Sequence, residues 1–268
     1  MSQWQNFLRN LGEWRGSFAT VEGRDPQGRG VVGGSTASIL SLEGAENNAL
    51  VRFRLRRFEA QVDVLAPGEP VQPPLSDLQQ DYRSLGRQVV FFSTGTFCKG
   101  SLQVAPGTAF GAEFGFVCGD RRHRLVQLYS PEGVHQSLVL IREFRAGSTA
   151  LEQPPLQPDR LAGRWQGETA TISADWPEPE LQPCVLECAG QADPASLLLR
   201  QDGVEEVLQP IWLPDGGCTV VQPQISHRQA FAVQAFWLPQ PDALIRLVRR
   251  YDATGAWLSA SHTVLHRA

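Results

Sequence analysis

The chain has 268 residues, 42% of them hydrophobic and 19% charged, a composition typical of folded globular proteins and not of disordered ones. This length suits two domains of about 110–150 residues each. The net charge of −4 argues against a nucleic acid or an anionic membrane as the partner of the whole molecule. No run approaches the roughly 18 apolar residues of a membrane span, and residues 4–14 lack the apolar segment of a secretory signal.

Cysteine and histidine spacing predicts no metal site. Cys184 and Cys188 form the pattern C-x3-C, but no second pair matches it elsewhere in the chain. His262 and His266 lie four positions apart, which on a strand is about 13 Å and too far to share one metal. We therefore expect no metal, no cofactor, and five reduced thiols in a cytoplasmic protein.

The chain opens with a pattern that predicts a short helix. Trp4, Phe7, Leu8 and Leu11 follow the helical spacing i, i+3, i+4 and i+7, so they share one face. Ser2 is suited to cap the start of this helix, and Gly12 to end it. The sequence then enters Gly12-Glu13-Trp14 directly, which we interpret as the opening of the first strand.

The rest of the first half alternates apolar and polar residues, as strands with one buried face do. One exception is predicted at Leu78–Leu85, where we expect a helix capped by Ser76 and ended by Gly86. The expected strands include residues 51–55, 89–92, 110–117, 125–129 and 138–141.

Two segments occur twice in the same order. LGEWRG at residues 11–16 returns as AGRWQG at 162–167, and RLVQLYSPEGVHQS at 124–137 returns as RLVRRYDATGAWLS at 246–259. Such a repeat indicates two copies of one domain. We place the first at residues 1–147, a Pro-rich linker at 148–158, and the second at 159–268.

The second copy is shorter. The two anchors are 112 positions apart in the first copy and 83 in the second, which we attribute to loss of the predicted helix. Many short antiparallel strands must hide their sheet edges, and closing each sheet into a barrel does so. We therefore predict an all-β chain of two tandem antiparallel barrels, the second trimmed.

A short helix, a Gly-x-Trp strand and a late arginine are similar to the calycin plan of lipocalins and fatty-acid-binding proteins. In that plan the tryptophan closes one end of the barrel and the arginine packs across it. The residues are Gly12, Trp14 and Arg142 in the first copy, and Gly163, Trp165 and Arg267 in the second.

The tandem arrangement resembles, more specifically, the DUF3598 family of lipocalin-like double barrels from cyanobacteria and plastids. The segments that carry this resemblance are Phe110–Gly133, Leu138–Arg145 and the echo at Arg246–Gly255. It implies a fold and not an activity, because one fold hosts many functions.

Arginines on the repeated strand are the main candidates for a binding site. Arg124 and Tyr129 are five apart and therefore lie on opposite faces of a strand. An arginine inside a barrel suits an anionic amphiphile. The structural alternative, which we favour, pairs it with Glu113 or Glu143. The candidate ligand-binding residues are Arg124, Arg142, Glu113, Tyr129, Trp14, Arg246 and Tyr251, although Trp14 is first expected to plug the barrel.

The basic run Arg121-Arg122-His123-Arg124 follows Gly119-Asp120. We interpret it mainly as a hairpin tip, with an anion or partner contact as the alternative.

No Gly-x-Ser-x-Gly, P-loop or Gly-x-Gly-x-x-Gly stands where a strand meets a helix, so hydrolases, NTPases and dinucleotide enzymes are not indicated.

We predict a non-catalytic binding protein for a small hydrophobic or amphiphilic ligand: a tetrapyrrole, a carotenoid-derived molecule or a lipid. One alternative, by resemblance to the phycobilin-attaching lyases of the calycin group, is a bilin lyase or isomerase. Another is a scaffold or assembly factor with filled barrels that contacts a protein partner.

Overall fold

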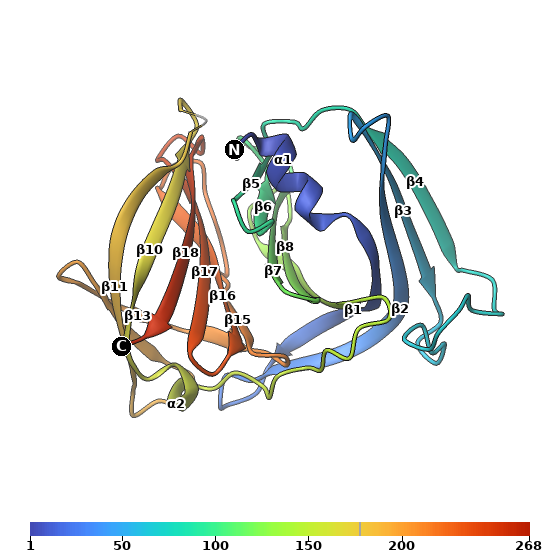
Figure 1. The fold of residues 1–268 in the computed structure, drawn as a ribbon. Helices are drawn as coiled ribbons and strands as arrows, with labels where there is room; N and C mark the ends of the chain where they lie inside the picture. The colour runs from blue at the N-terminus through green and yellow to red at the C-terminus, as the bar shows by residue number, and fades with distance from the viewer. Residues whose placement is uncertain (177) are drawn as a thin grey trace.

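The computed structural model describes residues 1–176 and 178–268, which form two nine-stranded antiparallel sheets (Figure 1). Helix α1 (Gln3–Phe7) precedes the first sheet and α2 (Pro158–Leu161) the second. The strands of the first sheet are β1 (Gly12–Arg24), β2 (Gly30–Ala45), β3 (Leu50–Phe58), β4 (Ser76–Tyr82), β5 (Val89–Phe91), β6 (Phe97–Gly100), β7 (Phe110–Cys118), β8 (Arg121–Tyr129) and β9 (His135–Arg145). Those of the second are β10 (Gly163–Ser173), β11 (Glu180–Gly190), β12 (Leu197–Gln201), β13 (Val204–Leu208), β14 (Pro210–Trp212), β15 (Gly217–Val220), β16 (Phe231–Gln240), β17 (Ala243–Tyr251) and β18 (Trp257–Arg267).

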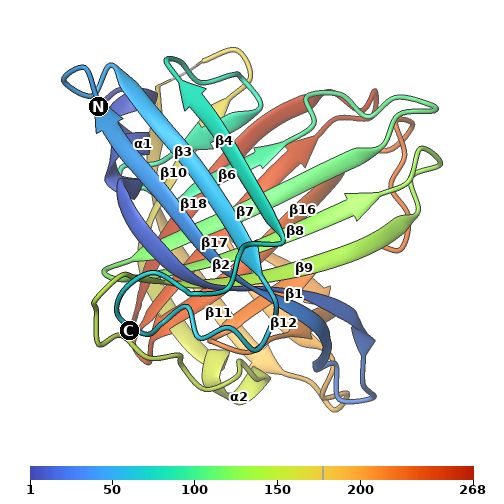
Figure 2. The same ribbon diagram turned by 90° about the vertical axis from the view of Figure 1, so that its right-hand side faces the viewer.

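Both sheets have the same strand order, with the first strand paired to the last and the edges formed by the fourth and fifth strands of each copy. The predicted all-β class of two tandem antiparallel barrels is confirmed, as a half-barrel and a nearly closed barrel. In the second sheet a single residue, Gln209, separates edge strands β13 and β14. In the first, residues 83–88 separate β4 from β5, and the sheet stays open there (Figure 1). From the side, β2, β3 and β4 cross in front of β7 and β8, which gives the half-barrel its trough shape (Figure 2).

The N-terminal helix forms as predicted. Ser2 accepts a hydrogen bond from the Gln5 backbone amide, and the Gln5 side chain accepts one from the Ser2 amide, so the two residues complete a capping box. A 3₁₀ turn (Leu8–Asn10) follows and ends before Gly12, whose φ of +121° favours glycine. The helix packs its apolar face against β5 and closes one end of the half-barrel.

The two Gly-x-Trp strands have the same geometry. The Trp14 indole Nε1 donates to the Asn10 carbonyl at 2.9 Å, and that of Trp165 donates to the Leu161 carbonyl at 2.8 Å. Each indole lies under a late arginine at 4.3 Å from the ring centroid, Arg145 in the first copy and Arg267 in the second.

The prediction that Arg142 packs across Trp14 is wrong, because Arg145 takes that place. Arg142 lies on the other face of β9, where it pairs with Glu152. Arg145 and Arg267 occupy the same register, because β9 and β18 pair with the first strand of each copy in the same way.

The predicted helix at 78–85 is wrong: Ser76–Tyr82 is the edge strand β4. Its even positions face the trough, and its acidic residues lie beside arginines of β3, with Arg54 and Asp77 paired at 2.6 Å. Pairing also satisfies the backbone of β3, which would otherwise be an open edge. The second copy has its own counterpart, β13, so its shorter length comes from shorter strands and loops and not from a missing element.

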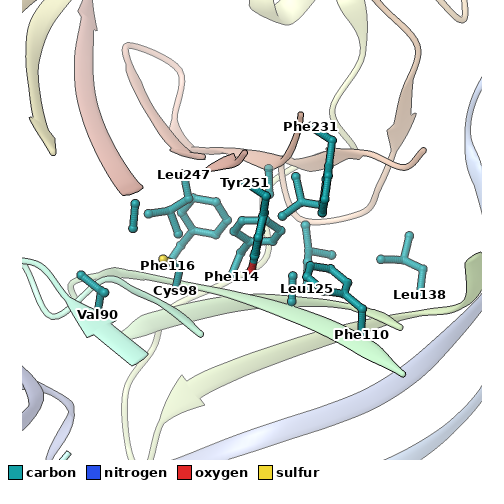
Figure 3. Close-up of a cluster of buried hydrophobic side chains, with 14 of the residues drawn as sticks. Val90, Cys98, Phe110, Phe114, Phe116, Leu125, Leu138, Phe231, Leu247 and Tyr251 are labelled. Atoms are coloured by element: carbon teal, nitrogen blue, oxygen red, sulfur yellow. The ribbon is translucent and has the colours of Figure 1, made fainter. Parts of the chain in front are cut away.

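The two sheets pack back to back through a shared cluster of buried apolar side chains (Figure 3). At its centre, Phe231 stacks on Tyr251 at 4.7 Å and Phe110 contacts both rings edge-on. The fully buried Arg249 crosses this interface, and its Nη2 donates to the Gly100 carbonyl at 3.2 Å. Gly100 allows this approach, since a Cβ there would lie 2.8 Å from the Arg249 Nε.

Candidate ligand-binding site

A cavity of about 310 Å³ lies inside the half-barrel, beside the opening between β4 and β5. This volume falls at the lower end of the range for small-molecule sites. Its polar lining includes Gln80, Gln88, Lys99 and Glu113. Its apolar walls come from the trough strands and from α1, and they include Phe7, Leu40, Leu42, Phe53, Tyr82, Phe91 and Phe97.

Arg124 lies at the base of this cavity in a saturated ion-pair network. Its Nε and Nη2 donate to the two oxygens of Glu143 at 3.0 and 3.1 Å, and its Nη1 donates to Glu113 at 2.8 Å. The structural alternative for Arg124 is thus realised, and both proposed partners take part. Burial alone would raise the pKa of Glu143, but the guanidinium groups of Arg124 and Arg122 hold it below its usual range. Arg124 joins strands β7, β8 and β9 and has few donors left for a ligand.

Arg122, two residues earlier on the same face of β8, also borders the cavity. It is 3% exposed, its guanidinium lies 5.0 Å from the centre of the Trp14 ring, and its Nε is 3.5 Å from Glu143. Within the described part of the chain, neither its Nε nor its Nη1 has a hydrogen-bond partner. Burial lowers the pKa of Arg122 to about 10, because Glu143 compensates the charge only in part.

Comparison with known proteins now identifies the family. Residues 1–148 match the family described as "Domain of unknown function (DUF3598), N-terminal". A crystal structure of a DUF3598 protein of unknown function from Nostoc punctiforme PCC 73102 is 31% identical, covers both chains completely and has a TM-score of 0.84. The chain belongs to the DUF3598 family. Residues 152–202 and 185–268 match the family described as "Biogenesis factor required for ATP synthase 1, C-terminal domain".

More distant solved structures add little. A putative outer membrane protein from Bacteroides fragilis covers both chains completely at 8% identity with a TM-score of 0.25. The S-type phycobiliprotein lyase CPES from Guillardia theta is 10% identical with a TM-score of 0.18, over 100% of this chain and 93% of the other. At these scores neither bears on fold or function. No protein with a curated description matches the chain.

The basic run of this DUF3598 protein is divided between two faces. Strand β8 begins at Arg121, so Arg121 and His123 point away from the cavity, toward the second sheet. There both contact Asp215, His123 through Nδ1 at 3.3 Å, and His123 stacks on Trp237. Burial lowers the pKa of His123, although Asp215 opposes this effect. The hairpin tip is therefore confined to Gly119 and Asp120, and the run is a strand that serves both a cavity and an interface.

Four of the predicted ligand residues lie elsewhere. Tyr129 and Tyr251 belong to the interface between the sheets, because odd and even positions of β8 and β17 face opposite ways. Arg246 lies inside the second barrel, where the amide oxygens of Gln234 and Gln201 accept its hydrogen bonds. Arg142 lies on the convex face of β9, paired with Glu152.

Of the other three, Arg124 and Glu113 line the cavity, and Trp14 is fully buried beneath it against Arg122. Sequence reasoning missed Arg122 because the basic run was interpreted as a turn. The internal repeat could have identified Arg122 as part of the strand. It corresponds to the apolar Leu244 in the second copy, two positions before the repeated Arg-Leu-Val.

The second barrel is filled by its own side chains. Trp165, Leu186, Phe236 and Leu265 are all fully buried in one cluster that includes Trp212. Among residues 1–176 and 178–268, no helix is both long and apolar enough to cross a membrane.

Proposed function

We propose that this DUF3598 protein is a non-catalytic binding protein that takes one small hydrophobic or amphiphilic molecule into its half-barrel. The observation that carries this proposal is the cavity of about 310 Å³, with mainly apolar walls and a few polar groups at its base. Candidate classes are lipids, carotenoid-derived molecules and tetrapyrroles. The cavity opens between β4 and β5, so a ligand longer than the cavity would extend through the mouth.

A thermal-shift screen of the full chain against these three classes tests the proposal. A ligand at 100 times its Kd should raise Tm by about 5–10 °C. Leu78, on edge strand β4 at the mouth, is 54% exposed. Leu78→Trp should narrow the mouth and weaken binding at little cost in stability. Val207→Trp, on the corresponding edge strand β13, is the matched control, because Val207 is 62% exposed and borders no cavity of the half-barrel.

Two results would contradict the proposal. One is no shift with any class, together with no ligand retained after native purification and mass spectrometry. The other is a shift that Leu78→Trp and Val207→Trp affect equally, because it would place the ligand outside the half-barrel.

A second candidate, an assembly factor, is favoured by one different observation. The match of residues 152–202 and 185–268 is to a domain named for a biogenesis factor of ATP synthase. The second barrel is filled, so its working surface would be external, and edge strand β13 exposes Val204 and Val207 there. In a strain lacking this protein, a reduced amount of assembled ATP synthase with normal subunit synthesis would support this function. Normal assembly would exclude it.

A further inference from the structure

Arg122 differs from Arg124, Arg246 and Arg249 in how its donors are used. The three nitrogens of Arg124 all donate to carboxylates, and those of Arg246 all donate to amide oxygens. Arg249 is fully buried, and its Nε and Nη2 donate to Tyr251 Oη and to backbone carbonyls. Within the described residues, Arg122 has two nitrogens without an acceptor, although burying an unpaired donor is costly.

The charges around the cavity leave a positive excess. Its lining carries the cations Lys99, Arg122 and Arg124 and one carboxylate, Glu113. Glu143 adds a second carboxylate just beneath the lining, but its oxygens are shared with Arg124. Arg122 and Arg124 balance Glu113 and Glu143 in formal charge, so the excess comes from Lys99, which is exposed. This cation and the unpaired donors of Arg122, in the described part of the chain, both favour an anion in the cavity.

We propose that Arg122 binds the acidic head group, a carboxylate or phosphate, of a single-chain amphiphile whose tail lies along Leu40, Leu42 and Phe53. This inference rests on the proposed function, because it uses the same cavity and names the class of ligand. The cavity volume of about 310 Å³ lies at the lower end of the range for small-molecule sites. One short alkyl chain with its head group fits this space, whereas the four rings of a tetrapyrrole would have to extend through the mouth.

The aromatic face beside Arg122 supports this orientation. The guanidinium lies over Trp14, whose ring is also covered by Arg145. These contacts hold the Arg122 side chain in place before a ligand arrives, so little side-chain entropy is lost on binding. Arg124 serves as a positioning residue, since its ion pairs keep Glu143 beside Arg122 and leave the donors of Arg122 free.

Calorimetric titration of the full chain with decanoate, decyl phosphate and decanol tests the inference. The wild type should bind the two anions roughly 10- to 100-fold more tightly than decanol, the effect of charged hydrogen bonds. Arg122→Met should abolish this preference and leave decanol affinity within about threefold. Arg142→Met, which removes a guanidinium from the convex face, should keep the full preference.

The variants are chosen so that they fold. Methionine is unbranched and fills the space over Trp14, and Glu143 keeps Arg124 as its partner. Arg122→Lys retains the charge and should keep part of the preference, which separates loss of charge from loss of packing.

The outcomes separate the two proposals. Equal binding of decanoate and decanol by the wild type, or an anion preference that survives Arg122→Met, would overturn the role of Arg122 and leave the binding cavity standing. No binding of any of the three, in a protein that also fails the wider ligand screen, would overturn both.

Discussion

The two sheets share strand order and pairing register but differ in what fills their concave faces. Arg124 and Arg246 occupy the same position in the repeat, but carboxylates neutralise Arg124 whereas neutral amide oxygens accept the hydrogen bonds of Arg246. Around them the half-barrel is charged where the second barrel is apolar or neutral. The corresponding pairs are Arg122 and Leu244, Glu143 and Leu265, and Glu113 and Gln234.

This difference shows how one repeat produces one filled barrel and one hollow one. Leu244 and Leu265 pair across β17 and β18 and pack with Trp165 in the interior of the second barrel. Their counterparts Arg122 and Glu143 carry charges that must keep polar neighbours, so the half-barrel cannot collapse around them. The connections between the edge strands differ in the same sense. A single residue joins β13 to β14 in the filled barrel, whereas residues 83–88 separate β4 from β5 in the hollow one.

The largest expected effect comes from giving the half-barrel the leucine of the second barrel. Glu143→Leu leaves Arg122 without its nearby carboxylate and should reduce the free energy of unfolding by about 3–5 kcal/mol. The double variant Arg122→Leu/Glu143→Leu copies the Leu244–Leu265 pair and should recover at least about 2 kcal/mol of this loss. Urea unfolding of the wild type and of both variants measures these differences. A Glu143→Leu variant as stable as the wild type would show that the ion pairs do not control the interior.

The next effect concerns His262, whose counterpart in the first sheet is Leu140. Burial lowers the pKa of His262 from its usual 6.5 to about 4. The unfolded chain therefore takes up this proton first as the pH falls. His262 therefore does not reduce the free energy of unfolding above about pH 6.5, but it reduces that free energy by about 3 kcal/mol as the pH falls to 4.

His262→Leu should flatten the pH dependence of urea unfolding by that amount and leave the slope to which His123 and His135 contribute, because burial lowers the pKa of both. Stability at pH 7 should not fall, because the His262 Nε2 has no hydrogen-bond partner in the described structure. An unchanged slope between pH 7 and pH 4 would contradict the burial of His262.

The smallest effect compares the two interface tyrosines. The Tyr251 hydroxyl donates to the Ser101 carbonyl at 2.8 Å and accepts from Arg249 Nε at 2.7 Å, whereas the Tyr129 hydroxyl donates to the neutral Gln127 Oε1 at 3.1 Å. Tyr251→Phe should cost about 1.5–3 kcal/mol because it leaves the Nε of the buried Arg249 without its acceptor, and Tyr129→Phe about 0.5–1.5 kcal/mol. Thermal unfolding of the two variants side by side checks this order. Equal costs would show that the hydroxyl contact of Arg249 contributes little.

The sequence by itself determined the repeat, the all-β class and the local motifs. The capping box at Ser2 and the two Gly-x-Trp starts depend on neighbours within a few residues, so their patterns are legible without the fold. Alternation also placed Arg124 and Tyr129 on opposite faces of one strand, as the structure has them.

Only the tertiary structure decided what each face meets. Ser76–Tyr82 becomes a strand because β3 offers an unpaired edge and arginine partners more than fifteen residues away, which local helix spacing cannot register. Whether Arg145 or Arg142 covers Trp14 depends on the pairing of β9 with β1. Likewise, Arg122 has unpaired donors in the described structure because Glu143, which comes from another strand, is already shared with Arg124. A charged side chain becomes a candidate binding residue when it lacks partners. Which partners it has depends on strands that are distant in sequence.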